Sequence, residues 1–298
     1  MESVVSHNKI GQFFMHLICV LLCIACVAPF ILLIVSSLTE EATLMRNGYS
    51  FWPEVWSLET YLYILRKGST ILRAYGITVF VTVVGTVVSI LITLMFSYPL
   101  SRKELPFRYQ LSFFVFFTML FNGGLIPTYM MYTNTFHIKN TIFALIIPSL
   151  LMNAFYVMMM RSFFTSNIPD ELVEAARIDG AGEYKILFRI VIPLSIPMVA
   201  TLTLMVGLGY WNDWLNGLYY LTDTSLFSIQ NVLNKMITDV QFLSTNASSI
   251  ASSVDTSSLP SVGIRMAIAV IGVLPILVIY PFFQRYFVKG IVVGGVKG

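Results

Sequence analysis

Residues 168–193 read IPDELVEAARIDGAGEYKILFRIVIP, a polar segment between two long apolar parts of the chain. The surrounding stretch Arg161–Arg189 holds 9 of the chain's 33 charged residues within 29 positions. Charges crowded into one short segment, with few elsewhere, indicate that this segment lies in water while its neighbours do not. We therefore expect a solvent-exposed loop between two membrane-embedded segments.

The polar segment has the start and stop signals of a short helix. Asn167 is placed to N-cap it, and Pro169 falls in its first turn. Asp170 and Glu171 suit the positive end of the helix dipole. Gly180 supplies the left-handed residue that ends many helices. The spacing i, i+3, i+4, i+7 predicts one face made of four residues: Leu172, Ala175, Ala176 and Asp179.

A second short helix is expected from about residue 182 to residue 192. Pro193 marks its junction with the next apolar stretch, and Pro197 predicts a kink within that stretch. The two alanines of the first helix would let a partner backbone approach closely, while the flanking charges orient it. The alternative from pattern alone is a solvated amphipathic hairpin at the lipid headgroups.

Composition places the rest of the chain in a membrane. Of 298 residues, 57% are hydrophobic and 11% are charged, whereas about 25% charged is usual in a soluble domain. A helix that spans a bilayer takes about 20 residues. Six stretches without Asp, Glu, Lys or Arg are long enough to form such a helix. They are Ile10–Thr39, Ala74–Ser101, Tyr109–Ile138, Asn140–Met160, Ile190–Asn212 and Met266–Gln284. The sequence thus predicts an all-α membrane protein with six transmembrane helices.

The basic residues predict the orientation of the chain. With the N-terminus inside the cell, 11 of the 18 Lys and Arg residues fall on cytoplasmic segments. The short loop Ser101–Arg108 carries three of them and is the strongest local element of this bias. We therefore expect both termini, and the polar segment 168–193, on the cytoplasmic side.

Two external segments are long. Glu40–Arg73 carries several aromatic side chains and is expected to lie against the membrane surface. Asp213–Arg265 begins with apolar residues at a helical period. A partner contact through Leu226, Ile229 and Leu233 is one hypothesis for this half, beside simple packing. The second half, Ser244–Ser261, contains eight serines and is typical of a flexible connector.

The marks of catalysis and of metal binding are missing from the sequence. Gly290–Gly295 has the glycine spacing of a phosphate-binding loop, but the required Lys-Ser or Lys-Thr does not follow. Cys19, Cys23 and Cys26 share one helical face in the first apolar stretch, and we interpret them as packing residues rather than metal ligands. We expect no enzyme activity in this chain, no metal ion and no nucleic-acid partner.

Part of the polar segment forms a pattern with fixed gaps: Glu174-Ala175-Ala176, three residues, Gly180, nine residues, then Ile190-x-Ile192-Pro193. This pattern resembles the EAA loop of binding-protein-dependent ABC importers, which usually has leucine where this chain has Ile192. Further stretches are similar to the carbohydrate-uptake branch, the lipoprotein/polysaccharide-type relatives of maltose permeases. These stretches are the IDGA at 178–181, Gly123–Tyr129, Trp211–Trp214 and Arg285–Gly290.

The resemblance implies a type I ABC importer permease, whose EAA loop is a cytoplasmic coupling helix that docks on an ATPase. The implied coupling residues are Glu174, Ala175, Ala176, Asp179, Gly180, Ile190 and Pro193. In relatives the C-terminal tail also reaches the ATPase, which points to Lys289, Gly290 and Lys297. The large external loop of relatives touches the solute-binding protein. ATP and magnesium would be bound by the partner ATPase, and this chain would hold no cofactor.

A sugar path needs amide and aromatic side chains within the membrane. By residue type the candidates are Asn122, Asn153, Tyr156, Tyr210 and Trp211. Asn122 has a rival role as the cap of a helix broken at Gly123-Gly124, while Tyr210 and Trp211 suit an interfacial belt equally well. Asn153 is the hardest to explain structurally, because an amide in hydrocarbon needs a partner.

The resulting organisation has three parts. Residues 1–72 form an N-terminal span with the external aromatic loop, 73–286 the permease core with the EAA loop at 161–193, and 287–298 a cytoplasmic tail. The expected function is that of a permease subunit of an ATP-driven importer for an oligosaccharide or polysaccharide-derived sugar, in the bacterial cytoplasmic membrane. Its expected partners are a second homologous permease, an ATPase dimer, a solute-binding protein and the lipid bilayer.

Two alternatives remain open from the sequence. The same architecture could import amino acids, peptides or other small solutes. A more remote alternative is a membrane scaffold or sensor that works without an ATPase.

Overall fold

The computed structural model describes residues 9–66, 68–250 and 262–295. These residues are mainly helical and contain no strand, apart from one isolated antiparallel bridge between Thr39 and Trp56. By its internal contacts the chain forms two units, Met1–Gly68 with Met236–Leu274 and Ser69–Lys235 with Pro275–Gly298. The predicted boundaries at residues 72 and 286 concern function rather than contacts and stay a prediction.

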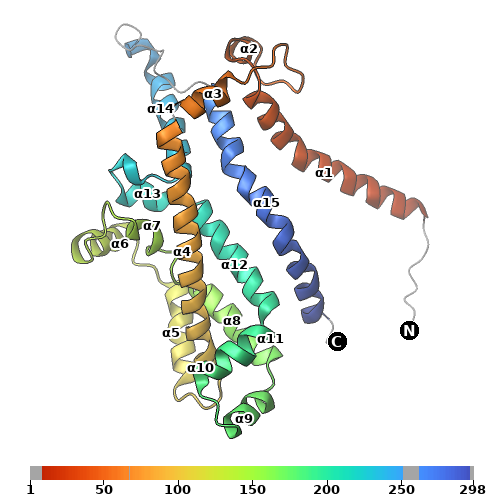
Figure 1. Ribbon diagram of the computed structural model, residues 1–298, viewed down its shortest axis with the longest axis vertical. Helices are drawn as coiled ribbons and strands as arrows, with labels where there is room; N and C mark the ends of the chain where they lie inside the picture. Colours follow the sequence, from red (N-terminus) through yellow and green to blue (C-terminus); the bar gives the residue numbers. More distant parts are fainter. Residues whose placement is uncertain (1–8, 67, 251–261, 296–298) are drawn as a thin grey trace. The chain divides into compact units, whose positions relative to one another are not determined.

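The first unit contains α1 (Lys9–Ser37), α2 (Glu41–Asn47) and α3 (Glu59–Arg66). The end of α14 (Ile229–Ile250) and the start of α15 (Val262–Gly295) also belong to it (Figure 1). Glu41 fixes the start of α15, because its carboxylate accepts hydrogen bonds from the backbone N–H of Val262 and Gly263, each at 2.9 Å. Those two donors would otherwise lack a partner within the helix.

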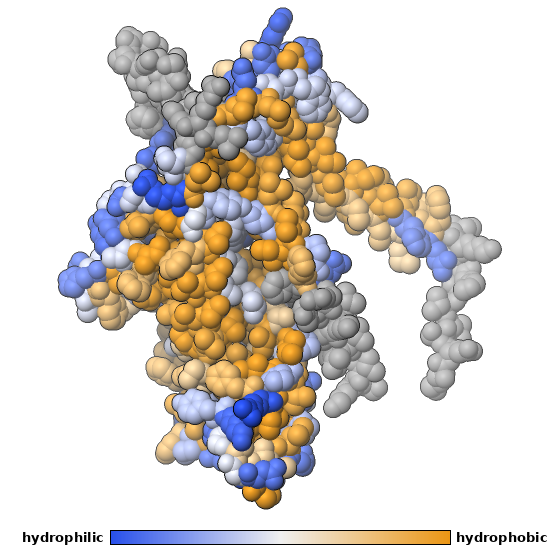
Figure 2. All heavy atoms as spheres, viewed as in Figure 1, coloured by the Kyte–Doolittle hydropathy of each residue, from blue (hydrophilic) through white to orange (hydrophobic). Residues whose placement is uncertain are grey.

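The second unit is built around α4 (Gly68–Ser101). Its other elements are α5 (Arg108–Leu120), α6 (Leu125–Met130), η1 (Met131–Thr135), α7 (Phe143–Ile146), α8 (Ala154–Asn167), α9 (Asp170–Ile178), α10 (Glu183–Ile186), η2 (Leu187–Val191), α11 (Ile192–Leu194), α12 (Ile196–Trp211), α13 (Leu215–Tyr220) and η3 (Thr224–Leu226), followed by the beginning of α14 and the end of α15. On the face shown in Figure 2, apolar side chains cover the middle of this unit, and hydrophilic ones gather at the end where Figure 1 places α9.

Small residues let α4 pack closely against its neighbours. Gly85, Ser89, Thr93 and Ser97 recur every four residues on one buried face. The Ser97 hydroxyl donates to the carbonyl of Val157 in α8 at 3.0 Å. A Cβ on Gly85 would lie 2.5 Å from the Tyr210 ring of α12, so only glycine fits there.

The described residues contain three helices that are long and apolar enough to cross a membrane, or five if each of two bent pairs counts as one span. The single helices are Gly11–Ser37, Ser69–Ser101 and Val262–Phe282, which agree with the first, second and sixth predicted stretches. The third and fifth stretches are the bent pairs. Arg108–Leu120 and Leu125–Thr135 meet at 109°, and Glu183–Leu194 and Ile196–Trp211 meet at 86°.

The fourth predicted stretch, Asn140–Met160, is not one helix. It contains α7, a turn in which Ser149 has φ +62°, and the start of α8, which continues past Arg161. Pro148 contributes to the break, since it lacks a backbone N–H for a helical hydrogen bond. The expectation of one continuous helix here is wrong, and the count of six spans stays a prediction.

The external helix predicted after residue 226 is confirmed as α14. It continues to Ile250, so the first part of Ser244–Ser261 is helical and the expectation of a flexible connector is wrong there. Residues 251–261 lie outside the described residues.

Candidate functional site

The helix predicted from the polar segment is α9, and its first turn contains Asp170 and Glu171 as expected. Pro169 occupies the N-cap position, and no side chain caps the helix. Asn167 instead ends α8, where its side-chain amide donates to the carbonyl of Phe163 at 3.1 Å. The prediction that Asn167 caps α9 is wrong, because α8 continues through that residue.

The other end of α9 confirms the role predicted for Gly180, whose φ of +79° lies in the left-handed region. The N–H of Gly180 donates to the carbonyl of Arg177, and the N–H of Ala181 donates to the carbonyl of Ala176, both at 2.9 Å. These two bonds form a Schellman motif, which satisfies carbonyls that the helix leaves free. Residues with a side chain rarely adopt this backbone conformation.

The buried side of α9 differs from the predicted face. Val173 and Ala176 are 2% and 8% exposed, and both join the main apolar cluster of the second unit. The predicted face grouped Ala176 with Leu172, Ala175 and Asp179, yet those three are exposed. Leu172, Ala175 and Asp179 thus lie on the open side of α9, while Ala176 lies at its buried edge beside Val173.

The open side of α9 carries three of the seven residues expected to couple to an ATPase. Glu174, Ala175 and Asp179 are exposed. Leu172 is 44% exposed and Ile178 is 87% exposed, which leaves two large apolar side chains without a cover. Within the described part of the chain, Glu174 makes no ion pair. This side therefore combines uncovered apolar groups with a free carboxylate.

The N-terminal end of α9 is attached to the loop that follows α4. Asp170 pairs with Lys103 at 2.7 Å and with Arg102 at 3.6 Å. The Arg102 side chain is 6% exposed, and its guanidinium lies over the Tyr98 ring, 5.1 Å from the centroid. The hydrogen bond from Lys103 holds the pKa of Asp170 below its ordinary value.

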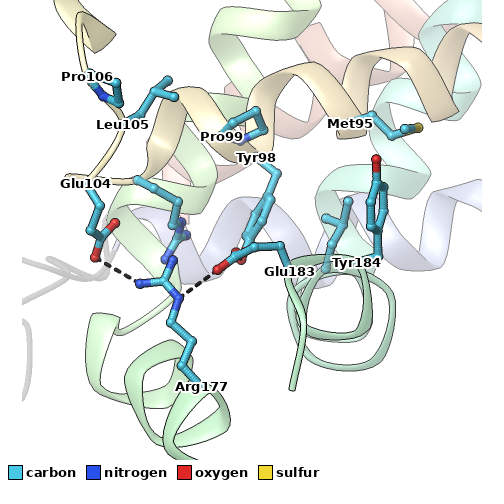
Figure 3. Close-up of a pocket in the computed structure, with 11 residues that line it drawn as sticks. Met95, Tyr98, Pro99, Glu104, Leu105, Pro106, Arg177, Glu183 and Tyr184 are labelled. Atoms are coloured by element: carbon cyan, nitrogen blue, oxygen red, sulfur yellow. Dashed lines mark hydrogen bonds and ion pairs between the residues drawn. The ribbon is translucent and has the colours of Figure 1, made fainter. Parts of the chain in front are cut away.

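The C-terminal end of α9 is attached to the same loop and to α10 (Figure 3). Arg177 Nη1 lies 3.2 Å from Glu104 Oε1, and Arg177 Nε lies 2.7 Å from Glu183 Oε1. The Tyr98 hydroxyl donates to Glu183 Oε2 at 2.7 Å. These residues line a cavity of about 410 Å³, whose apolar walls include Met95. Hydrogen bonding to Glu183 raises the pKa of Arg177.

The last coupling candidates lie where the chain bends toward α12. Ile190 is half-buried in the π-helical turn η2, and Pro193 is exposed in α11. The 86° bend falls at Ser195, between Pro193 and Pro197. The predicted junction at Pro193 and the kink at Pro197 therefore correspond to one break that lies between them.

The five candidates for a sugar path each have a local structural role. Asn122 accepts a hydrogen bond from the N–H of Gly124 at 2.9 Å, inside the break between α5 and α6. Asn153 caps α8 by accepting from the N–H of Phe155, which supplies the partner its amide needs.

The aromatic path candidates pack against neighbours. Tyr156 is half-buried, with its ring 5.9 Å from that of Phe155. The buried Tyr210 donates to the carbonyl of Ile146 at 2.9 Å. Trp211 packs edge-to-face on Tyr75 and lines a cavity of about 220 Å³ between α4, α12 and α15. Whether any of the five contacts a sugar stays a prediction.

The three residues predicted to contact a partner on the external side differ in how far they are exposed. Leu226, in η3, and Leu233, in α14, are partly buried. Ile229 is fully buried, and its backbone N–H donates to the Thr78 hydroxyl at 2.9 Å. Ile229 therefore packs within the second unit. In the tail, Lys289 and Gly290 fall within α15, while Lys297 lies outside the described residues.

Comparison with known proteins adds to this geometry. Residues 64–293 match the family described as binding-protein-dependent transport system inner membrane component. The chain belongs to this family. It is 37% identical to Protein LplC of Bacillus subtilis over 91% of this chain and 90% of that protein. It is 35% identical to the polygalacturonan/rhamnogalacturonan transport system permease protein YtcP of the same organism, over 98% and 99%.

A solved structure of a bacterial ABC transporter involved in the import of the acidic polysaccharide alginate is also similar. That structure is 26% identical in sequence to this chain, with a TM-score of 0.80. The match covers 96% of this chain and 100% of that chain. The family is one of membrane components, so this chain is a multi-pass membrane subunit of an ABC importer and not its ATPase. ABC importers of this family work with an ATPase and a solute-binding protein.

The sequence did not identify the residues that attach α9 to the rest of the second unit. Arg102 and Lys103 contribute to the basic charge of Ser101–Arg108, no role was predicted for Glu104, and Arg177 lies between the fixed positions of the motif. A usable signal was present, since both segments contain basic as well as acidic residues. Opposite charges in two short loops on the same side of a membrane would be expected to pair.

Proposed function

We propose that this chain is one of two membrane subunits of an ATP-driven importer whose cargo is an oligosaccharide released from a polysaccharide. The cargo assignment is supported by the relatives, which include permeases named for polygalacturonan, rhamnogalacturonan and arabinooligosaccharides, and by the alginate importer. ATP and magnesium bind to the partner ATPase, and a separate solute-binding protein delivers the sugar from outside.

The observation that carries the proposal is the form of α9. This helix is capped at Gly180, attached at both ends by ion pairs, and open on the side that carries Glu174, Ala175 and Asp179. An attached helix with uncovered apolar groups suits docking into a groove of another protein. ATP-driven movement of that protein would displace α9 and shift the spans between inward-open and outward-open states.

The remaining assignments follow from this role. The protein lies in the bacterial cytoplasmic membrane with both termini and α9 in the cytoplasm. A second, homologous permease completes the path, because each chain supplies one coupling helix. The part of α14 around the partly buried Leu233 meets the solute-binding protein, and the tail with Lys289, Gly290 and Lys297 reaches the ATPase.

The coupling role is tested with the complete transporter, purified with the subunits that accompany it and reconstituted in vesicles. Glu174→Lys reverses the charge of an exposed carboxylate on the open side of α9 that makes no ion pair among the described residues. Sugar uptake is expected to fall about tenfold or more, the effect of roughly 1.4 kcal/mol at an interface. Glu54→Lys makes the same charge change at an exposed position in the external loop and should leave uptake unchanged. Wild-type uptake by the Glu174 variant would contradict the proposal.

The cargo is tested separately with the solute-binding protein that accompanies the complex. Acidic and neutral oligosaccharides, amino acids and peptides are compared by calorimetric titration. Binding of an oligosaccharide, with no binding of amino acids or peptides, is the expected result. Purification without any ATPase, and no uptake after reconstitution, would instead favour a scaffold or sensor.

A further inference from the structure

Three elements of the second unit meet at the Arg177 guanidinium, and a fourth, α4, is joined to them through Glu183. Arg177, in the last turn of α9, pairs with Glu104 in the loop after α4 and with Glu183 at the start of α10. Glu183 uses its second oxygen to accept a hydrogen bond from Tyr98, near the end of α4. Figure 3 shows these side chains pointing toward one another at the rim of the cavity. The contacts form one continuous chain from α4 through α10 to α9.

The covalent connection between α9 and α10 is short and flexible by composition. Asp179, Gly180, Ala181 and Gly182 separate the two helices. Two glycines in four residues allow backbone rotations that other residues resist. Without a further tie, movement of α9 would be absorbed by this linker rather than passed to α10.

Apolar packing alone attaches α9 only weakly to the rest of the second unit. Of its nine residues, Val173 and Ala176 are the buried ones, and alanine offers only a methyl group. Because these two residues lie on adjacent turns, α9 contacts the apolar cluster over a short length and can pivot there. The ion pairs at Arg177 lie one turn beyond Val173 and resist that pivot at the end nearest α10.

We infer that Arg177 is a positioning residue: it makes α9, α10 and the end of α4 move together, so that force applied to α9 reaches the membrane-spanning helices. This inference rests on the proposed coupling role of α9 and adds the means of transmission. The guanidinium suits the task because its planar fork reaches two carboxylates with separate nitrogens, which a lysine ammonium cannot do with the same geometry.

The partners of Arg177 are about half exposed, with 56% for the Glu104 side chain and 53% for that of Glu183. Pairs this exposed contribute little to global stability. The effect of removing Arg177 should therefore fall on coupling, not on folding or assembly.

The test compares ATP hydrolysed per sugar imported in vesicles that contain the complete transporter. Arg177→Gln is expected to raise this ratio about fivefold or more, the lower end of usual coupling effects. Arg177→Lys keeps the charge and should restore part of the coupling. Lys185→Gln removes a charge from an exposed position on α10 and should keep the wild-type ratio. Thermal unfolding and subunit content of each complex are measured alongside.

An unchanged ratio in Arg177→Gln would overturn the inference, as would an equal rise in Lys185→Gln or a rise matched by loss of subunits. These outcomes are distinct from failure of the proposed function. If the wild-type chain retains no ATPase, or Glu174→Lys transports normally, the coupling role of α9 itself is wrong. If those tests succeed and Arg177→Gln stays coupled, only the role of Arg177 is refuted.

Discussion

Replacing Gly180 with alanine changes one backbone conformational energy, at the C-terminal end of α9. The residue has φ +79°, and no heavy atom lies within 4 Å of a Cβ placed there, so an added methyl group meets no steric obstacle. The remaining cost is that of holding an L-residue in the left-handed region, about 1–2 kcal/mol. That cost falls on the Schellman motif, whose two bonds close the end of α9.

The neighbouring Gly182 provides a matched control. It caps α10 with φ −72° and ψ 158°, an extended conformation open to any residue, and a Cβ there also meets nothing within 4 Å. Gly182→Ala should therefore be neutral or slightly stabilising, because it reduces the freedom of the unfolded chain. The two substitutions add the same methyl group and differ only in backbone conformation.

Amide hydrogen exchange of the peptide that contains Gly180 and Ala181 measures the effect where it occurs. A loss of about 1–2 kcal/mol speeds exchange roughly 5–30-fold. Asparagine tolerates the left-handed region better than alanine, so Gly180→Asn should fall between alanine and the wild type. The reasoning is refuted if Gly180→Ala leaves exchange unchanged, or if Gly182→Ala speeds it equally.

Two further predictions address packing and charge. Gly85→Ala should lower the thermal unfolding midpoint, since its Cβ would lie 2.5 Å from the Tyr210 ring, and overpacking costs about 1–3 kcal/mol; Gly76→Ala, which meets nothing within 4 Å in the same helix, should not lower it. The depressed pKa of Asp170 means that its pair with Lys103 contributes stability above the ordinary pKa near 3.8, and that this contribution is lost as the pH falls below it. The unfolding midpoints of the wild type and Asp170→Asn should therefore differ by a constant amount from pH 5 to pH 8 and converge as the pH falls below 3.8. Equal midpoints from pH 5 to pH 8 would show that the pair does not stabilise the fold.

The long helices were the most predictable part of the fold, because a helix that crosses a membrane must be long and carry few charges. Ala74–Ser101 is contained in the single helix α4. Charge is a poor guide to helix ends, however. Helix α8 runs through Arg161, whose Nε donates to the carbonyl of Leu100 at 3.0 Å, so this charged residue stays inside a helix. Bends are also invisible to a charge count, although glycines at 123–124 and prolines at 193 and 197 flank two of them.

Helix α9 shows which structural features sequence spacing can predict and which it cannot. The motif predicted a helix that ends at Gly180, because local backbone chemistry determines a helix end. It did not predict which side is buried, because residues 172, 173, 175 and 176 are all apolar and two overlapping stripes fit the helical period. The choice depends on the cluster around Phe164 and Ile186, which only the folded chain assembles.

The ion pairs at both ends of α9 compensate for the limited apolar burial along its sides. In the proposed coupling role one side of α9 faces a moving partner and cannot be buried in its own protein; the buried apolar residues of α9 are Val173 and Ala176. Its ends are free of this conflict, and Asp170 and Arg177 attach them to the single loop at 102–104. Charged pairs are directional and hold an element at defined points. Because that loop directly continues α4, a displacement of α9 has a short route into a membrane-spanning helix.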